Sequence, residues 1–140
     1  MSESAAWTAL RPHLNAAGLD PVRIEVKGAL GVPDVNLTTG WVEMKFKRNA
    51  PKGVETKLEV DHFTIEQRAW LTRRWNARTG GRRAWVVLYV QHPKPIWLLI
   101  QGDRAARHLG RVPLGQLLLI ATVVGSHPSD LIGKLSECPM

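Results

Sequence analysis

Asp34, Glu43 and Lys45 have the side-chain types that metal-dependent phosphodiester cleavage requires. The aspartate follows a Gly-x-Pro turn, and the glutamate and lysine form a Glu-x-Lys pair on a segment that returns after Thr38-Thr39-Gly40. Paired carboxylates hold hard divalent cations, which neutralise phosphoryl oxygens, stabilise the leaving alkoxide and lower the pKa of bound water. A lysine beside them orients or deprotonates the attacking water, or stabilises charge in the transition state.

The segment 41–47 alternates charged or aromatic residues with apolar ones, as a strand with one face in a core does. Glu43 and Lys45 share the face opposite the apolar side chains, so we expect them to point away from the core, together with Trp41. If the preceding strand pairs with this one as a hairpin in the matching register, Asp34 lies near both. A solvated strand face would show the same alternation, and Glu-x-Lys alone is common, so the joint pattern carries the inference.

Hydrophobic spacing, capping signals and Gly or Pro breaks predict the elements that position these side chains. We expect helices at 4–17, 64–78, 103–109 and 128–136, and strands at 23–27, 33–37, 41–47, 84–90 and 96–100. Residues 48–60 predict a basic loop, and the apolar segment 115–124 is ambiguous. The order of these elements predicts a single α/β domain over residues 1–140 with a mixed sheet.

The formal net charge of +7 and the pI of about 10.2 favour a polyanionic partner, nucleic acid first and an anionic membrane surface second. The lone Cys138 excludes an intramolecular disulfide and Cys-rich zinc sites, so a metal would need oxygen or scattered histidine ligands. No apolar run reaches the length of ~18 residues that a membrane span needs, and no secretory signal pattern opens the sequence. We therefore expect a cytoplasmic protein. P-loop, dinucleotide and Gly-x-Ser-x-Gly motifs are absent.

Basic residues flank the three candidate residues in the sequence. Those expected to contact a phosphate backbone are Lys47, Arg48, Lys52, Arg74 and Arg78. Such contacts predict binding that is sensitive to salt and largely independent of sequence. A solvated basic surface is the alternative. Most of the six tryptophans fit core patterns, and Trp41 is the exception.

Pro33-Asp34 and Glu43-Met44-Lys45 together resemble the motif of the PD-(D/E)xK nuclease superfamily, and the resemblance spans residues 3–91. It implies a restriction-endonuclease-like α/β/α sandwich with a central mixed sheet. It also implies Mg²⁺ or Mn²⁺ held by Asp34, by Glu43 and by the backbone carbonyl of Met44. Lys45 would then act on the attacking water.

Several branches of that superfamily, including virus-type replication-repair nucleases and Holliday-junction-resolvase-like proteins, carry a glutamine on the next helix. Gln67 matches this place, and a Gly-Gly break and an apolar strand follow it. Gln67 is also the last member of the capping-box pattern that opens this helix at Thr64, so a purely local role stays open. Many members add a glutamate from the first helix. Glu3 is the preferred candidate and Glu25 the alternative, which leaves the number of metals open.

These features predict a Mg²⁺- or Mn²⁺-dependent deoxyribonuclease that hydrolyses phosphodiester bonds in double-stranded or branched DNA, with no membrane partner. The expected setting is the cytoplasm of a bacterium or a phage-infected cell, in replication, repair or recombination. Analogy with resolvases admits a homodimer with paired sites. The alternatives are a non-catalytic basic module that binds nucleic acid, and a phage assembly protein whose charge offsets packaged nucleic acid.

Overall fold

A computed structural model of the chain describes residues 3–24, 31–77 and 83–137. Its strands are β1 (Val22–Arg23), β2 (Val35–Leu37), β3 (Gly40–Asn49), β4 (Ala84–His92), β5 (Ile96–Gln101) and β6 (Val123–Gly125). Its helices are α1 (Glu3–Ala16), α2 (Ile65–Trp75), α3 (Gly102–His108), α4 (Leu114–Ile120) and α5 (Ile132–Leu135), with a 3-10 turn η1 (Pro128–Leu131) before α5. None of the helices in these ranges is both long enough and apolar enough to cross a membrane.

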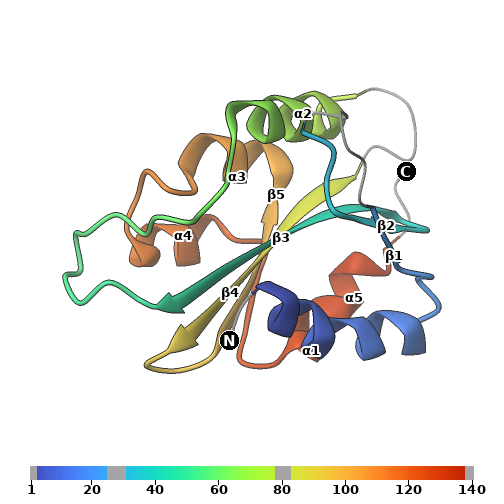
Figure 1. Cartoon of the computed structure of the whole chain (residues 1–140), viewed down its shortest axis with the longest axis horizontal. Coiled ribbons are helices and arrows are strands. Elements are labelled where there is room, and N and C mark those ends of the chain that lie inside the picture. Colours follow the sequence, from blue (N-terminus) through green and yellow to red (C-terminus); the bar gives the residue numbers. More distant parts are fainter. Residues whose placement is uncertain (1–2, 25–30, 78–82, 138–140) are drawn as a thin grey trace.

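The strands form one six-stranded sheet in which β1 to β6 lie in chain order (Figure 1). Strands β3 and β4 are parallel, and each other neighbouring pair is antiparallel. A parallel pair needs a long crossover connection, and α2 lies in that crossover. The α/β class and the mixed sheet expected from the sequence are confirmed.

Most predicted elements form close to their expected limits, and the differences have local causes. The ambiguous apolar segment divides into α4 and the edge strand β6, because Val123 pairs with Leu99 of β5. The helix expected at 128–136 becomes η1 followed by α5. The loop expected from residue 48 starts after Asn49, since β3 continues beside β4 to that residue. The second helix ends at Trp75, where Asn76 is its C-cap, and not at residue 78. Strand β1 ends at Arg23, so Ile24 is not part of the strand expected at 23–27. Residues 25–27 and 78 of these two predictions lie outside the described residues.

Helices pack on both faces of the sheet (Figure 1). On one face, Leu10 and Leu14 of α1 join Val42 and Met44 of β3 in a buried cluster that also includes residues of η1 and α5. On the other face, a second buried cluster contains residues of α2, α3 and α4, with Leu71 of α2 fully buried. The sheet is therefore covered on both sides over β3 and β4.

This covering corrects one expectation for β3. The predicted alternation is present, because Val42 and Met44 lie in the α1 cluster while Glu43 and Lys45 lie beside Val86 and Leu88. However, the charged face does not point into open solvent, since α2 and the second cluster cover it. The exposed fractions of Glu43 and Lys45 are only 3% and 2%. Alternation along one strand does not reveal a second layer of helices.

Gly31 fixes the distance between the turn before Asp34 and the start of α2. It has a left-handed backbone with φ of +85°, and a Cβ at this position would collide with the backbone carbonyl of Glu66. Gly18 provides a comparison, because its φ is +74° but a Cβ there would meet nothing within 4 Å. Both glycines therefore need a left-handed backbone, but only at Gly31 does the backbone also lie in close contact with α2.

We expect Gly18→Ala to lower the free energy of unfolding by about 1 kcal/mol, the cost of a Cβ in the left-handed region. Gly31→Ala should cost about 3 kcal/mol, because it adds displacement of the first turn of α2. Urea unfolding of the two variants and the wild type measures both values. Equal losses in the two variants would show that the backbones of Gly31 and Glu66 are not in close contact.

Candidate active site

The β2–β3 hairpin brings the two candidate carboxylates together. Its register pairs Val35 with Val42, which places Asp34 opposite Glu43. The backbone N–H of Asp34 donates to Oε1 of Glu43 at 3.2 Å, and the backbone N–H of Met44 donates to Oδ1 of Asp34 at 3.0 Å. The hairpin register expected from the sequence is confirmed, and each acid is bound to the strand that carries the other.

Met44 contributes through its backbone. In a strand, the N–H and the C=O of one residue point to the same neighbouring strand. Because the Met44 N–H points to Asp34, the Met44 carbonyl also points to the β2 side of β3. The carboxylates of Asp34 and Glu43 and this carbonyl therefore come from adjacent positions where β2 begins.

Lys45 is the buried cation of the site. Its Nζ lies 3.3 Å from Oε2 of Glu43 and donates to the backbone carbonyl of His62 at 3.1 Å and to Oε1 of Gln67 at 3.3 Å. An ammonium group has three protons, so these three acceptors account for all of them. Nζ also lies over the ring of Phe63, 5.3 Å from its centroid, in a cation–π contact. The ammonium group of Lys45 is thus held in place by Glu43 of β3, by the segment that precedes α2 and by the first turn of α2.

Gln67 belongs to the capping box of α2 and also contacts the charged pair on β3. It completes the capping box of α2, since its backbone N–H donates to Oγ1 of Thr64 and its Oε1 accepts from the backbone N–H of Thr64, both at 3.1 Å. The same Oε1 accepts from Lys45, and Nε2 donates to Oε2 of Glu43 at 3.4 Å. The cap fixes the position of the side chain, and the amide then connects α2 to the charged pair on β3.

The contribution of His62 is one that residue types do not signal. Its backbone is left-handed, with φ of +59°, which is uncommon for a residue other than glycine. Its carbonyl, and not its imidazole, accepts the hydrogen bond from Lys45. The sequence places this histidine next to the helix start but carries no mark of the carbonyl's role.

The oxygen atoms at this site are of the type that a hard divalent cation prefers as ligands. Mg²⁺ keeps several waters and needs only one or two carboxylates from the protein, and the carboxylates of Asp34 and Glu43 with the Met44 carbonyl match that demand. Among the described residues, no group of three or more His, Cys, Asp or Glu side chains is placed to hold a metal. Glu25 lies outside the described residues. Glu3 begins α1, on the face of the sheet opposite α2, and its side chain also lies outside them.

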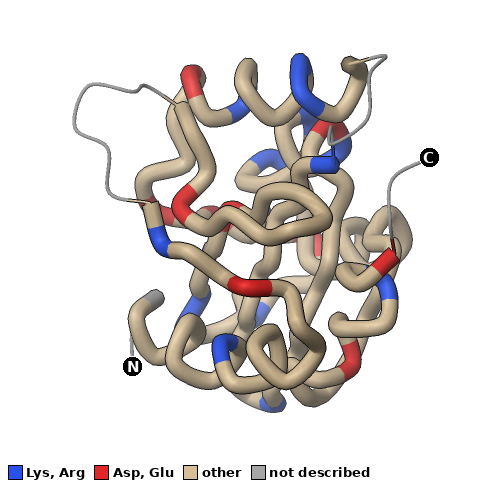
Figure 2. Tube along the Cα trace, turned by 90° about the vertical axis from the view of Figure 1, so that its right-hand side faces the viewer, with Lys and Arg blue, Asp and Glu red and all other residues tan. Residues whose placement is uncertain are grey.

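The residues expected to contact a phosphate backbone are dispersed. Arg48 and Lys52 are exposed at the end of β3 and in the following loop, and Lys47 is half-buried. Arg74 lies on α2, the helix at the top of Figure 2 where one acidic position is followed by basic ones. Its guanidinium lies over the ring of Trp70, at 4.5 Å, so it already has an aromatic partner. Arg78 lies outside the described residues.

Trp41 lies on the expected face of β3 but is less accessible than expected. It is half-buried, packs against the second cluster, and meets Trp70 edge to face with ring centroids 5.5 Å apart. This contact uses ring surface that would otherwise stack on a base. Trp41 therefore contributes to the packing of α2 on the sheet beside the site.

Comparison with known proteins gives no matching family model, no matching curated sequence and no matching solved structure. What the chain does is therefore inferred from its own residues.

The buried pair should be strongly coupled. The side chains of Lys45 and Glu43 are 3% and 4% exposed. We expect Lys45→Met to lower the free energy of unfolding by about 3 kcal/mol, because it leaves the buried Glu43 carboxylate without its cation. The double variant Glu43→Gln/Lys45→Met should lose at least ~1 kcal/mol less than the sum of the two single losses.

Denaturant unfolding of the wild type, both single variants and the double variant measures this coupling. Glu59→Gln and Lys94→Met, alone and together, form a matched control cycle at exposed positions, where additive effects are expected. Additive losses at positions 43 and 45 would mean that the two charges do not depend on each other.

Proposed function

We propose that this protein is a Mg²⁺- or Mn²⁺-dependent nuclease that hydrolyses phosphodiester bonds in DNA. The observation that carries the proposal is the buried Lys45 ammonium between Glu43 and Gln67, next to an Asp34 that is hydrogen-bonded to the same strand. The proposed fold is the restriction-endonuclease-like α/β/α sandwich, which the helices on both faces of the sheet support. The proposed setting is the cytoplasm of a bacterium or a phage-infected cell.

Asp34, Glu43 and the Met44 carbonyl would hold the metal. When bound, a divalent cation neutralises phosphoryl oxygens and lowers the pKa of a coordinated water. Glu43 is already fixed by the Asp34 N–H, by Lys45 and by Gln67, so little reorganisation is needed before reaction. Gln67 acts as a positioning residue in this proposal, since it contacts both charged groups.

Lys45 would stabilise negative charge that develops on the phosphate. Its three protons are directed at acceptors inside the protein, so a phosphoryl oxygen must replace one of them. This arrangement suits an ammonium that keeps its protons better than it suits a base that removes one from water. The proposal therefore assigns Lys45 to electrostatic stabilisation.

DNA, double-stranded or branched, is the proposed substrate because of the excess of basic residues. The formal net charge is +7, and Arg48 and Lys52 are exposed near the end of the strand that carries Glu43 and Lys45. Exposed cations of this kind attract a phosphate backbone whatever its sequence.

A basic binding module without catalysis is the second candidate. It is favoured by one observation, the complete use of the Lys45 protons within the protein. A network satisfied in this way stabilises the fold and does not require a metal. Such a module would bind nucleic acid in EDTA and cut it under no condition.

Incubation with supercoiled, nicked, linear and branched DNA under Mg²⁺, Mn²⁺ or EDTA distinguishes the two. We expect metal-dependent cleavage that Asp34→Asn lowers by about 10²-fold or more, because a neutral amide replaces a metal-binding carboxylate. The amide keeps an oxygen acceptor for the Met44 N–H, so the variant should remain folded. Lys45→Met should lose a similar factor at a temperature where circular dichroism shows it folded.

Glu59→Gln and Lys94→Met, at exposed positions outside the cluster around Lys45, are the matched controls and should keep metal-dependent cleavage. Cleavage that persists in both Asp34→Asn and Lys45→Met would contradict the proposal. Binding in EDTA together with no cleavage under either metal would support the binding module instead.

A further inference from the structure

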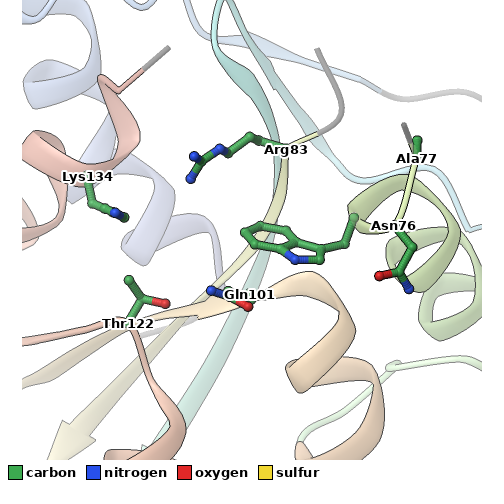
Figure 3. A pocket seen from close by; sticks show the side chains of 7 residues that line it. Asn76, Ala77, Arg83, Gln101, Thr122 and Lys134 are labelled. Atoms are coloured by element: carbon green, nitrogen blue, oxygen red, sulfur yellow. The ribbon is translucent and has the colours of Figure 1, made fainter. Parts of the chain in front are cut away.

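A pocket separate from the candidate active site lies at the end of the sheet where β4 starts and β5 ends. Its volume is about 670 Å³. It is lined by Trp75, Asn76, Ala77, Arg83, Gln101, Thr122 and Lys134 (Figure 3). These residues come from the end of α2, from the ends of β4, β5 and β6 and from α5, and none of them belongs to the cluster around Lys45.

Two cations point into the same part of this pocket. The side chains of Arg83 and Lys134 approach one space from different elements (Figure 3). A carboxylate already lies beside one of the two cations, because Oε2 of Glu137 forms an ion pair with Nζ of Lys134 at 2.8 Å. Lys134, with a smaller contribution from Arg83, lowers the pKa of Glu137. The two cations thus attract an oxyanion, and Glu137 is exposed enough to move away.

One polar group of the pocket has hydrogen-bonding capacity that the described protein leaves unused. Oγ1 of Thr122 is buried and has no hydrogen-bond partner among the described protein atoms. Gln101, the last residue of β5, places an amide beside it (Figure 3). A buried hydroxyl without a partner is destabilising, so this position favours a ligand that brings a hydrogen-bonding atom.

An indole forms the wall between the cations and the end of α2. Trp75 is held edge to face against Trp85, with ring centroids 4.9 Å apart. It is half-buried, and the guanidinium of Arg83 lies 5.9 Å from its ring centroid. Asn76, the C-cap of α2, also lines the pocket (Figure 3). An aromatic wall with amides beside it suits a flat ring that has polar edges.

We propose that this pocket binds one nucleotide, with its phosphate between Arg83 and Lys134 and its base against Trp75. The phosphate replaces the Glu137 carboxylate and accepts from Thr122, and the base edge meets the amides of the pocket. The nucleotide is either a free molecule or the phosphorylated end of a strand, and the chemistry of recognition is the same for both. The proposal does not depend on the nuclease activity.

Calorimetric titration of the full chain with dAMP, in EDTA and at low salt, tests the proposal without any metal-dependent step. We expect Arg83→Gln and Lys134→Gln each to weaken dAMP binding about tenfold, since each removes a charge-assisted contact. Thr122→Val should weaken binding about threefold without lowering the Tm, because the lost hydroxyl has no hydrogen-bond partner among the described residues. Glu137→Gln should tighten binding about threefold, because it removes the competing carboxylate.

Arg107→Gln and Lys94→Gln are matched controls that remove the same charges at exposed positions elsewhere. Deoxyadenosine and inorganic phosphate, titrated alone, should each bind more weakly than dAMP. A 5′-phosphorylated oligonucleotide that competes with dAMP assigns the site to a strand end, and dAMP binding without such competition assigns it to a free nucleotide. Either result supports a nucleotide pocket. Equal affinity for phosphate and dAMP, or binding that Arg83→Gln and Lys134→Gln leave unchanged, would overturn the proposal.

Discussion

The ion pair between Glu43 and Lys45 is the constraint on which the rest of the site depends. Two opposite charges stand on one face of an interior strand, almost without contact with water. Removing charges from water is costly unless each has partners, and both have them here. Glu43 accepts from the Asp34 backbone and from Gln67, and Lys45 donates to Gln67 and to the His62 carbonyl. These hydrogen bonds hold both the turn before β2 and the start of α2 against β3.

The topology explains why those partners can meet. Because β3 and β4 are parallel, the chain must cross the sheet between them, and α2 lies in that crossover. The first turn of α2 therefore lies over the face of β3 that carries the charges. Gly31 then permits the close approach of the Asp34 turn to the backbone of Glu66. The apolar side chains of β3 on the other face pack against α1, which fixes the rotation of the strand.

Local patterns in the sequence were sufficient to predict that the two acids lie close together and that a helix begins near Gln67. Period-two alternation separated Glu43 and Lys45 from Val42 and Met44, and the capping box located Gln67 near the start of its helix. The burial of the charged face was not predictable in the same way, because it depends on α2, α3 and α4 together. Backbone groups such as the His62 carbonyl leave no trace in residue types. The pocket around Arg83 and Lys134 joins segments far apart in the chain, which no spacing rule connects.

The central claim is that Asp34 and Glu43 together hold a divalent cation beside Lys45. Anomalous diffraction from crystals grown with Mn²⁺, compared with crystals of Asp34→Asn grown in the same way, measures this directly. We expect an anomalous peak between the two carboxylates in the wild type and its loss in the variant. The absence of a peak there at high Mn²⁺ concentration, with Glu43 still bound to Lys45, would contradict the account.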